Sequence, residues 1–213
     1  MRAALCDDAL RLGRMLVQLL PGESEVYGLL ALMELQASRT AARRGRKGEA
    51  VLLLHQNRSL WDYAQIERGM AALEHAQKLG GGAGNYALQA AIAACHTRAR
   101  TIEETDWERI VLLYDALLQI SPSPIVALNR AVAVGMARGP VAGLDAVDRL
   151  AADPALAGYH LLPSVRGDLL MKMGRFAEAR EEIQRAITMT QNLREQELLT
   201  ERLKQIEKAA LSA

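Results

Sequence analysis

Residues 105–139 limit the possible folds most strongly, because two apolar stripes of helical period meet there at a pair of prolines. Apolar side chains recur at i, i+3, i+4 and i+7 over residues 107–118, as they do along one face of a helix. A side-chain oxygen of Thr105 or Asp106 can cap the start of this helix. We expect Trp107, on the apolar stripe, to be buried as an anchor.

The two prolines separate this helix from the next one. Pro122 and Pro124 push the residues before them out of helical conformation, so the first helix has to end at Ser121. Pro124 suits the first position of a second helix, with Ser123 as its cap. Two helices joined so tightly cannot bury both stripes alone. The pattern therefore predicts similar pairs on either side.

Helical stripes and chain breakers alternate along the whole sequence of 213 residues. Half of the residues are apolar but only 4% are aromatic, a composition that suits closely packed helices rich in Ala and Leu. Strand patterns are almost absent. We predict an all-α fold of about ten helices in antiparallel pairs, wound into a right-handed superhelix of tetratricopeptide-like repeats. We expect residues 1–213 to form a single helical-repeat domain.

Two of the expected pairs show a repeat in the sequence itself. Residues 139–144 and 174–179 occupy the same point of two pairs and lie about 35 residues apart, close to the tetratricopeptide period of about 34. The tract GRFAEAREEIQRAI at residues 174–187 fits the turn and second helix of that repeat. The remaining pairs fit more loosely.

Charge and composition favour a cytoplasmic protein. The net charge of +1 gives no bulk attraction to nucleic acid or to an anionic membrane. Cys6 and Cys95 are too few and too far apart for a disulfide framework, which suits a reducing compartment. No apolar run approaches the ~20 residues needed to span a bilayer. We expect no membrane partner.

No arrangement of residues in the sequence indicates an enzyme. The four histidines are scattered, and neither an HExxH nor a paired CxxC motif is present. Cys95 and His96 are adjacent in a helical segment, so their side chains point to different faces. The glycines of residues 80–84 lack a preceding strand and a P-loop lysine. We expect no catalytic residues, no metal site and no cofactor.

Two polar segments are candidates for binding. The first is a basic loop, which either touches nucleic acid or an acidic protein surface or is simply a mobile solvated loop; it contains Arg39, Arg43, Arg44, Arg46 and Lys47. The second is HQNRSLW at residues 55–61. This segment is long enough to enter a groove of the repeats, and structural anchoring is an equally good interpretation.

Asn129 and Arg130 stand inside an otherwise apolar helix. In the tetratricopeptide register they line the concave groove, where Asn and basic residues hold carboxylates or backbone amides. A buried hydrogen-bonded pair is the alternative. We predict a protein contact on the concave side, made by Arg58, Trp61, Gln89, His96, Asn129 and Arg130.

Several blocks of the sequence follow one family pattern. They include LCDDALRLGRMLVQLLP, EVYGLLALMELQASR, NYALQAAIAACHTRA, TDWERIVLLYDALLQISPSPIVALNRAVAV and GYHLLPSVRGDLLMKMGRFAEA. The chain resembles the C-terminal extension of bacterial RNA polymerase sigma factors of the extracytoplasmic-function (ECF) type, in which a tetratricopeptide-like region follows the two sigma domains. The family usually has an acidic tract, LEDQDRSRW, where residues 54–61 read LHQNRSLW. Three carboxylates are replaced, so a role that needs this acidity is not expected here.

The resemblance implies a fragment that begins just after the promoter-reading domain, since no sigma DNA-binding or core-binding domain is recognisable. The implied function is regulatory: the region modulates transcription initiation by contact with a protein, which is the sigma domains of the same chain, RNA polymerase or a signalling partner. DNA would be reached only through the missing sigma domains. The alternative is a stand-alone peptide-binding adaptor.

Overall fold

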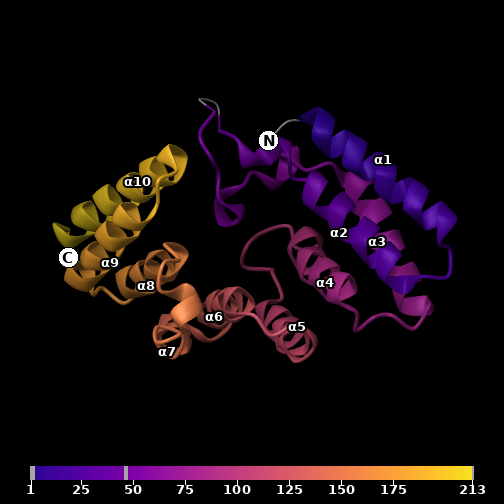
Figure 1. The fold of residues 1–213 in the computed structure, drawn as a ribbon. Helices are drawn as coiled ribbons and strands as arrows, with labels where there is room; N and C mark the ends of the chain where they lie inside the picture. Colours follow the sequence, from indigo (N-terminus) through magenta and orange to yellow (C-terminus); the bar gives the residue numbers. More distant parts are fainter. Residues whose placement is uncertain (1–2, 46–47, 213) are drawn as a thin grey trace. The chain divides into compact units, whose positions relative to one another are not determined.

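Helices account for nearly all regular structure in the computed structural model, which describes residues 3–45 and 48–212. Ten α-helices follow one another along these residues, and consecutive helices pack in antiparallel pairs (Figure 1). The described residues contain no strand beyond an isolated bridge between Arg44 and Ala50. The expected all-α class is confirmed, while the right-handed winding of the pairs stays a prediction. The helices are α1 Ala3–Leu19, α2 Ser24–Ala37, α3 Tyr63–Lys78, α4 Asn85–Arg98, α5 Trp107–Ile120, α6 Pro124–Arg138, α7 Pro140–Asp148, α8 Leu161–Lys172, α9 Phe176–Met189 and α10 Leu193–Ala210.

The chain forms two compact units, Met1–Pro122 and Ser123–Ala213. The boundary falls at the expected double-proline link, so α5 packs on α4 in the first unit and α6 packs on α7 in the second. The stripe of α5 is buried through Ile110, Val111 and Leu117, as the periodicity predicts. Trp107 is only half-buried, which corrects its expected role as the buried anchor.

Local signals set most helix ends. Asp106 accepts a hydrogen bond from the backbone N–H of Arg109 at 2.9 Å and caps α5, and Pro124 stands in the first turn of α6. Gly139 and Gly174 have φ of +93° and +73°, the left-handed conformation that ends a helix and that glycine adopts without strain. The two glycines therefore mark equivalent turns, as the 35-residue repeat predicts.

In the first unit, α2 lies at the centre and packs against α1, α3 and α4 (Figure 1). Ala31 and Leu35 of α2 are fully buried. A Cβ added to Gly28 would stand 2.7 Å from the backbone nitrogen of Ala87, closer than atoms can approach. Glycine at this position therefore lets the backbones of α2 and α4 touch.

One buried charge lies within this helical core. Glu34 of α2 is 1% exposed, and its Oε1 accepts hydrogen bonds from Nε and Nη2 of Arg14, at 2.9 and 2.6 Å. The Nε of Arg68 lies 3.4 Å from the same oxygen. Because α1 and α3 supply these arginines, a single carboxylate links three helices, and its removal would leave two cations without their acceptor.

The N-terminus of α4 is capped by a side chain from another helix. The helix begins at Asn85, and Gly84 before it has no side chain that could act as a cap. The carboxylate of Glu25 in α2 instead accepts from the backbone N–H groups of Tyr86 and Ala87, at 2.8 and 3.1 Å. A charged acceptor 61 residues away therefore serves the exposed N–H groups.

In the second unit, α6 to α10 pack one after another (Figure 1). Gly135 of α6 and Gly143 of α7 meet backbone to backbone, since a Cβ on Gly143 would lie 2.7 Å from the Cα of Gly135. In the next pair, Gly167 of α8 lies against Ala179 and Ile183 of α9 in the same manner. Small residues at the crossing points let each pair pack closely.

Candidate protein-interaction surfaces

Arg58 anchors the segment between α2 and α3 to the C-terminal end of α4. It belongs to a short 3-10 turn, Arg58–Leu60, which is capped by the side chain of Asn57. The Nη1 of Arg58 donates to the carbonyl oxygens of His96 and Ala99, both at 2.6 Å, and Nη2 lies 3.4 Å from Oγ1 of Thr105. A guanidinium is well placed there, because carbonyl groups at a helix C-terminus have no partner within the helix.

The ring of Trp61 is buried beside two guanidinium groups. Trp61 is 4% exposed and belongs to the core of the first unit. The guanidinium carbon of Arg58 lies 4.9 Å from the ring centroid, and that of Arg39 lies 6.0 Å from it. Both distances are in the range of cation–π attraction. Trp61 therefore fixes the segment to the core and offers almost no surface to a partner.

His96 is also buried, at 9% exposed, next to the same cations. Its ring meets Trp107 edge to face, with centroids 5.2 Å apart and planes at 71°. Burial, helped by the positive charges of Arg39 and Arg58, lowers the pKa of His96 from 6.5 to about 4. His96 is thus a neutral packing residue at pH 7.

Two arginines of the basic loop, Arg39 and Arg43, are built into the first unit. Arg39 is 6% exposed, and Arg43 is half-buried in the 3-10 turn Ala41–Arg43. Burial, with the nearby charges of Arg43 and Arg58, lowers the pKa of Arg39 to about 10. The interpretation as a solvated loop is therefore wrong for Arg39; Arg46 and Lys47 lie outside the described residues.

The other predicted contact residues lie nearer to the surface. Gln89 is half-exposed on α4 and donates from Nε2 to Oδ1 of Asn85 at 2.8 Å. Asn129 is exposed on α6, and Arg130 beside it is half-exposed. Arg58, Trp61, Gln89 and His96 belong to the first unit, and Asn129 and Arg130 to the second. That these six residues act together on a partner stays a prediction.

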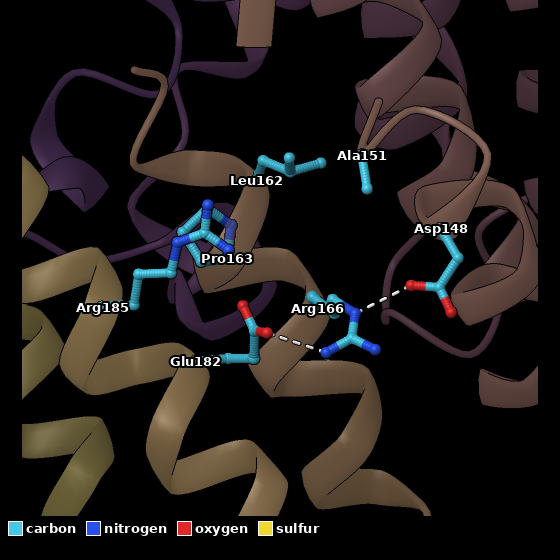
Figure 2. Close-up of a pocket in the computed structure, with 7 residues that line it drawn as sticks. All are labelled: Asp148, Ala151, Leu162, Pro163, Arg166, Glu182 and Arg185. Atoms are coloured by element: carbon cyan, nitrogen blue, oxygen red, sulfur yellow. Dashed lines mark hydrogen bonds and ion pairs between the residues drawn. The ribbon is translucent and has the colours of Figure 1, made fainter. Parts of the chain in front are cut away.

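A hollow in the second unit was missed by reasoning from the sequence. It has a volume of about 330 Å³ and opens between α7, α8 and α9, as Figure 2 shows. Its lining combines two arginines, two carboxylates and three apolar residues, namely Asp148, Ala151, Leu162, Pro163, Arg166, Glu182 and Arg185. A polar groove of this kind can hold a side chain or short segment of a protein partner.

Arg166 is fixed in this hollow by two carboxylates. Its Nε donates to Asp148 and its Nη1 to Glu182, each at 2.8 Å (Figure 2). The hydrogen bond to Asp148, followed by the charge of Asp148, raises the pKa of Arg166. Glu182 is mostly buried, although it lies on an amphipathic helix rich in charged residues. Arg185, which also lines the hollow, is exposed.

Over residues 3–45 and 48–212, no three or more His, Cys, Asp or Glu side chains gather in a way that would hold a metal ion. None of the helices in the same ranges combines the length and the apolar character needed to cross a membrane.

Comparison with known proteins adds relatives but no activity. Residues 1–77 match the model of a family described as "Family of unknown function (DUF6596)". The chain is 47% identical over 193 residues to an uncharacterized protein of Rhizobium meliloti (strain 1021). This likeness covers 91% of the chain but 45% of the relative, so the chain spans less than half of the relative's length. No solved structure matches the chain.

Proposed function

We propose that this chain is the protein-interaction region of a sigma factor of the extracytoplasmic-function type, and that it modulates transcription initiation by contacting another protein surface. The sequence blocks that resemble the C-terminal extension of that family support the proposal. The length of the Rhizobium meliloti relative, of which the chain spans 45%, leaves room for sigma domains in a longer chain.

The observation that carries the proposal is the series of antiparallel helix pairs with small residues at their crossings. Gly28 against Ala87 and Gly135 against Gly143 bring helix backbones into contact, so these helices pack closely. Helical-repeat proteins built from closely packed helix pairs use their extended surfaces to bind peptides and domains. The binding surface then needs no chemistry of its own.

We place the contact on the second unit, where the exposed polar side chains are free of the core. Asn129 is exposed, and the hollow of Figure 2 presents Arg185 at its rim above a fixed Arg166. Charged side chains that are held by ion pairs bind a partner with less loss of conformational entropy. Trp61 and His96 are buried and contribute by holding the first unit together.

The test is in vitro transcription with RNA polymerase and the longer sigma chain, with and without residues 1–213. A double variant, Asn129→Ala/Arg130→Ala, and the variant Arg185→Glu then probe the two faces of the second unit. Arg180→Ala/Gln184→Ala on α9 is the matched control, because both residues are exposed and lie outside the hollow. Thermal unfolding of each variant separates lost contact from lost structure.

We expect truncation to change initiation or promoter choice, and a folded Asn129/Arg130 or Arg185 variant to reproduce part of that change. Unchanged transcription after truncation, in all conditions tried, would refute the regulatory function. An effect of truncation without an effect of either folded variant would leave the region correct but move the contact elsewhere. A coding frame without sigma domains would favour the stand-alone adaptor.

A further inference from the structure

Two arginines in the first unit converge on one uncharged acceptor. Nη2 of Arg39 and Nη2 of Arg43 each donate to Oε1 of Gln36 at 2.6 Å. Guanidinium groups that meet at one oxygen ordinarily share a carboxylate, because only a charged acceptor offsets two cations. Among the described residues, neither arginine forms an ion pair with a carboxylate. The positive charge at Gln36 is therefore uncompensated.

A third guanidinium increases this charge. Arg58 and Arg39 both lie against the ring of Trp61, at 4.9 and 6.0 Å from its centroid. Burial lowers the pKa of Arg39, and the charges of Arg43 and Arg58 lower it further. The carboxylates that act on Arg58 are those of Glu103 and Glu104, which are exposed and are not bonded to it. Two cations thus lie against the buried ring and a third, Arg43, meets Arg39 at Gln36, with no anion bonded to any of them among the described residues.

Buried donors in the same place also lack acceptors. Nε of Arg39 and Nε1 of Trp61 are inaccessible to solvent and have no hydrogen-bond partner in the part of the chain that the structure describes. Arg39 is 6% exposed and Trp61 is 4% exposed, so water does not serve them freely. A buried donor without an acceptor costs about 1–3 kcal/mol. An anionic acceptor at this place would offset the positive charge and would also accept hydrogen bonds from the unpaired N–H groups.

We propose that Gln36, Arg39, Arg43, Arg58 and Trp61 form a binding site for an oxyanion with the charge and fork geometry of a carboxylate. Planar carboxylates match the paired N–H groups of guanidinium, and tetrahedral oxyanions use the same donors. The edge of the site is open, since Gln36, Arg43 and Arg58 are only half-buried. The ligand is a free oxyanion or an acidic side chain of a bound protein. The site does not depend on the proposed function.

The substitution Gln36→Glu tests this inference by supplying an anion from the protein itself. It places a carboxylate at the point where the two arginines already meet, so the side chain takes the place of the bound anion. We expect this variant to have a higher Tm than the wild type without added anion, by a few degrees. We also expect it to lose the response to anions. Gln65→Glu in α3 is the matched control, because Gln65 is likewise half-buried and the net charge changes equally.

The experiment measures the Tm of the 213-residue chain in sodium sulfate, in sodium phosphate and in sodium chloride of equal ionic strength. A fourth arm adds an acetylated, amidated hexaglutamate peptide. At about 100 times Kd, binding to the native state alone raises the Tm of a chain of this size by ~5–10 °C above the chloride value. Arg43→Gln, on a half-buried side chain, should weaken the apparent affinity at least ~10-fold.

A Tm increase in wild type and Gln65→Glu, but not in Gln36→Glu, supports the site. A response to sulfate and phosphate identifies a free oxyanion, and a response to the peptide alone identifies an acidic protein segment. The inference is overturned if no anion exceeds chloride, or if Gln36→Glu responds as strongly as wild type. If Gln36→Glu does not fold, the Arg43→Gln variant provides the test. An unchanged apparent affinity for the anion in that variant would overturn the inference equally.

Discussion

Replacement of Arg58 by alanine should destabilise the first unit selectively. Arg58 joins its 3-10 turn to the C-terminal end of α4, because it donates to two carbonyl groups there, those of His96 and Ala99. Without the guanidinium, both carbonyl groups near the C-terminus of α4 lose their hydrogen-bond donor. The ring of Trp61 loses the closer of its two cations at the same time.

The magnitude follows from these contacts. Hydrogen bonds from a charged donor contribute about 1.5–3 kcal/mol each, so two of them set an upper limit of ~3–6 kcal/mol. Arg58 is half-buried, and water can reach part of the vacated space. We therefore expect Arg58→Ala to lower the free energy of unfolding by ~2–4 kcal/mol. Arg58→Lys should cost about half as much, since one ammonium group replaces a two-pronged donor.

The two tryptophans make the assay specific, because Trp61 and Trp107 both belong to the first unit. Tryptophan fluorescence in urea follows that unit, while far-ultraviolet circular dichroism follows both. With a slope of ~2 kcal/mol per molar urea, the fluorescence midpoint should fall by ~1–2 M. Arg100→Ala, on an exposed arginine nearby, should stay within ~0.5 kcal/mol. Equal midpoints for Arg58→Ala and Arg100→Ala would refute the anchoring role.

Three further outcomes follow from the structure. Trp107→Ala should lower the free energy of unfolding by ~2–3 kcal/mol, through the loss of one hydrogen bond to Ile102 and of the edge contact with His96. This loss is smaller than for a fully buried aromatic residue, because the ring of Trp107 is half-exposed. Urea unfolding followed by circular dichroism measures it. The pKa of His96 is about 4 in the folded state and 6.5 when unperturbed, so the unfolded state binds the extra proton and stability should fall as pH drops from 6.5 to 4. His96→Phe should flatten that part of the stability–pH curve, and an unchanged slope would contradict the assignment. Gly143→Ala should destabilise the second unit by over ~2 kcal/mol, since its Cβ would lie 2.7 Å from the Cα of Gly135; a loss below ~0.5 kcal/mol in calorimetry would show that α6 and α7 can move apart freely.

The parts of the fold that sequence reasoning predicted are those set by neighbouring residues. Asp106 caps the helix that begins one residue later, and Pro124 stands in the first turn of α6. Gly174 ends α8 because its own backbone adopts a positive φ. Each of these signals acts over one to four residues, so the local sequence is sufficient.

Contacts between distant residues were not predictable in the same way. The carboxylate of Glu25 caps α4 across 61 residues, and Arg58 bonds to the carbonyl of His96 across 38. Nothing in the local sequence of either residue distinguishes it from a solvated surface charge. Glu25 reaches the N-terminus of α4 because α2 packs closely against α4, and this close packing is possible because Gly28 has no side chain.

The candidate binding sites were predicted least well, because charge and exposure are decided by packing. Arg39 lies in a stretch of high polarity and would be expected to be solvated, yet it is buried against Trp61. Glu182 follows another glutamate on an amphipathic helix, yet it faces Arg166 rather than water. Composition gives the number of charges in a segment but does not indicate which of them lose their water.

The order of residues around α4 also matters while the protein is being made. Glu25 and Arg58, which hold the two ends of this helix, both precede it in the chain. When α4 leaves the ribosome, its N-terminal and C-terminal partners have already been synthesised, and nothing later than Pro122 is needed to complete the first unit. At ~5–20 residues per second, the ribosome takes about 5–20 s to make the second unit, residues 123–213. The first unit can therefore close around α4 before the second unit has appeared.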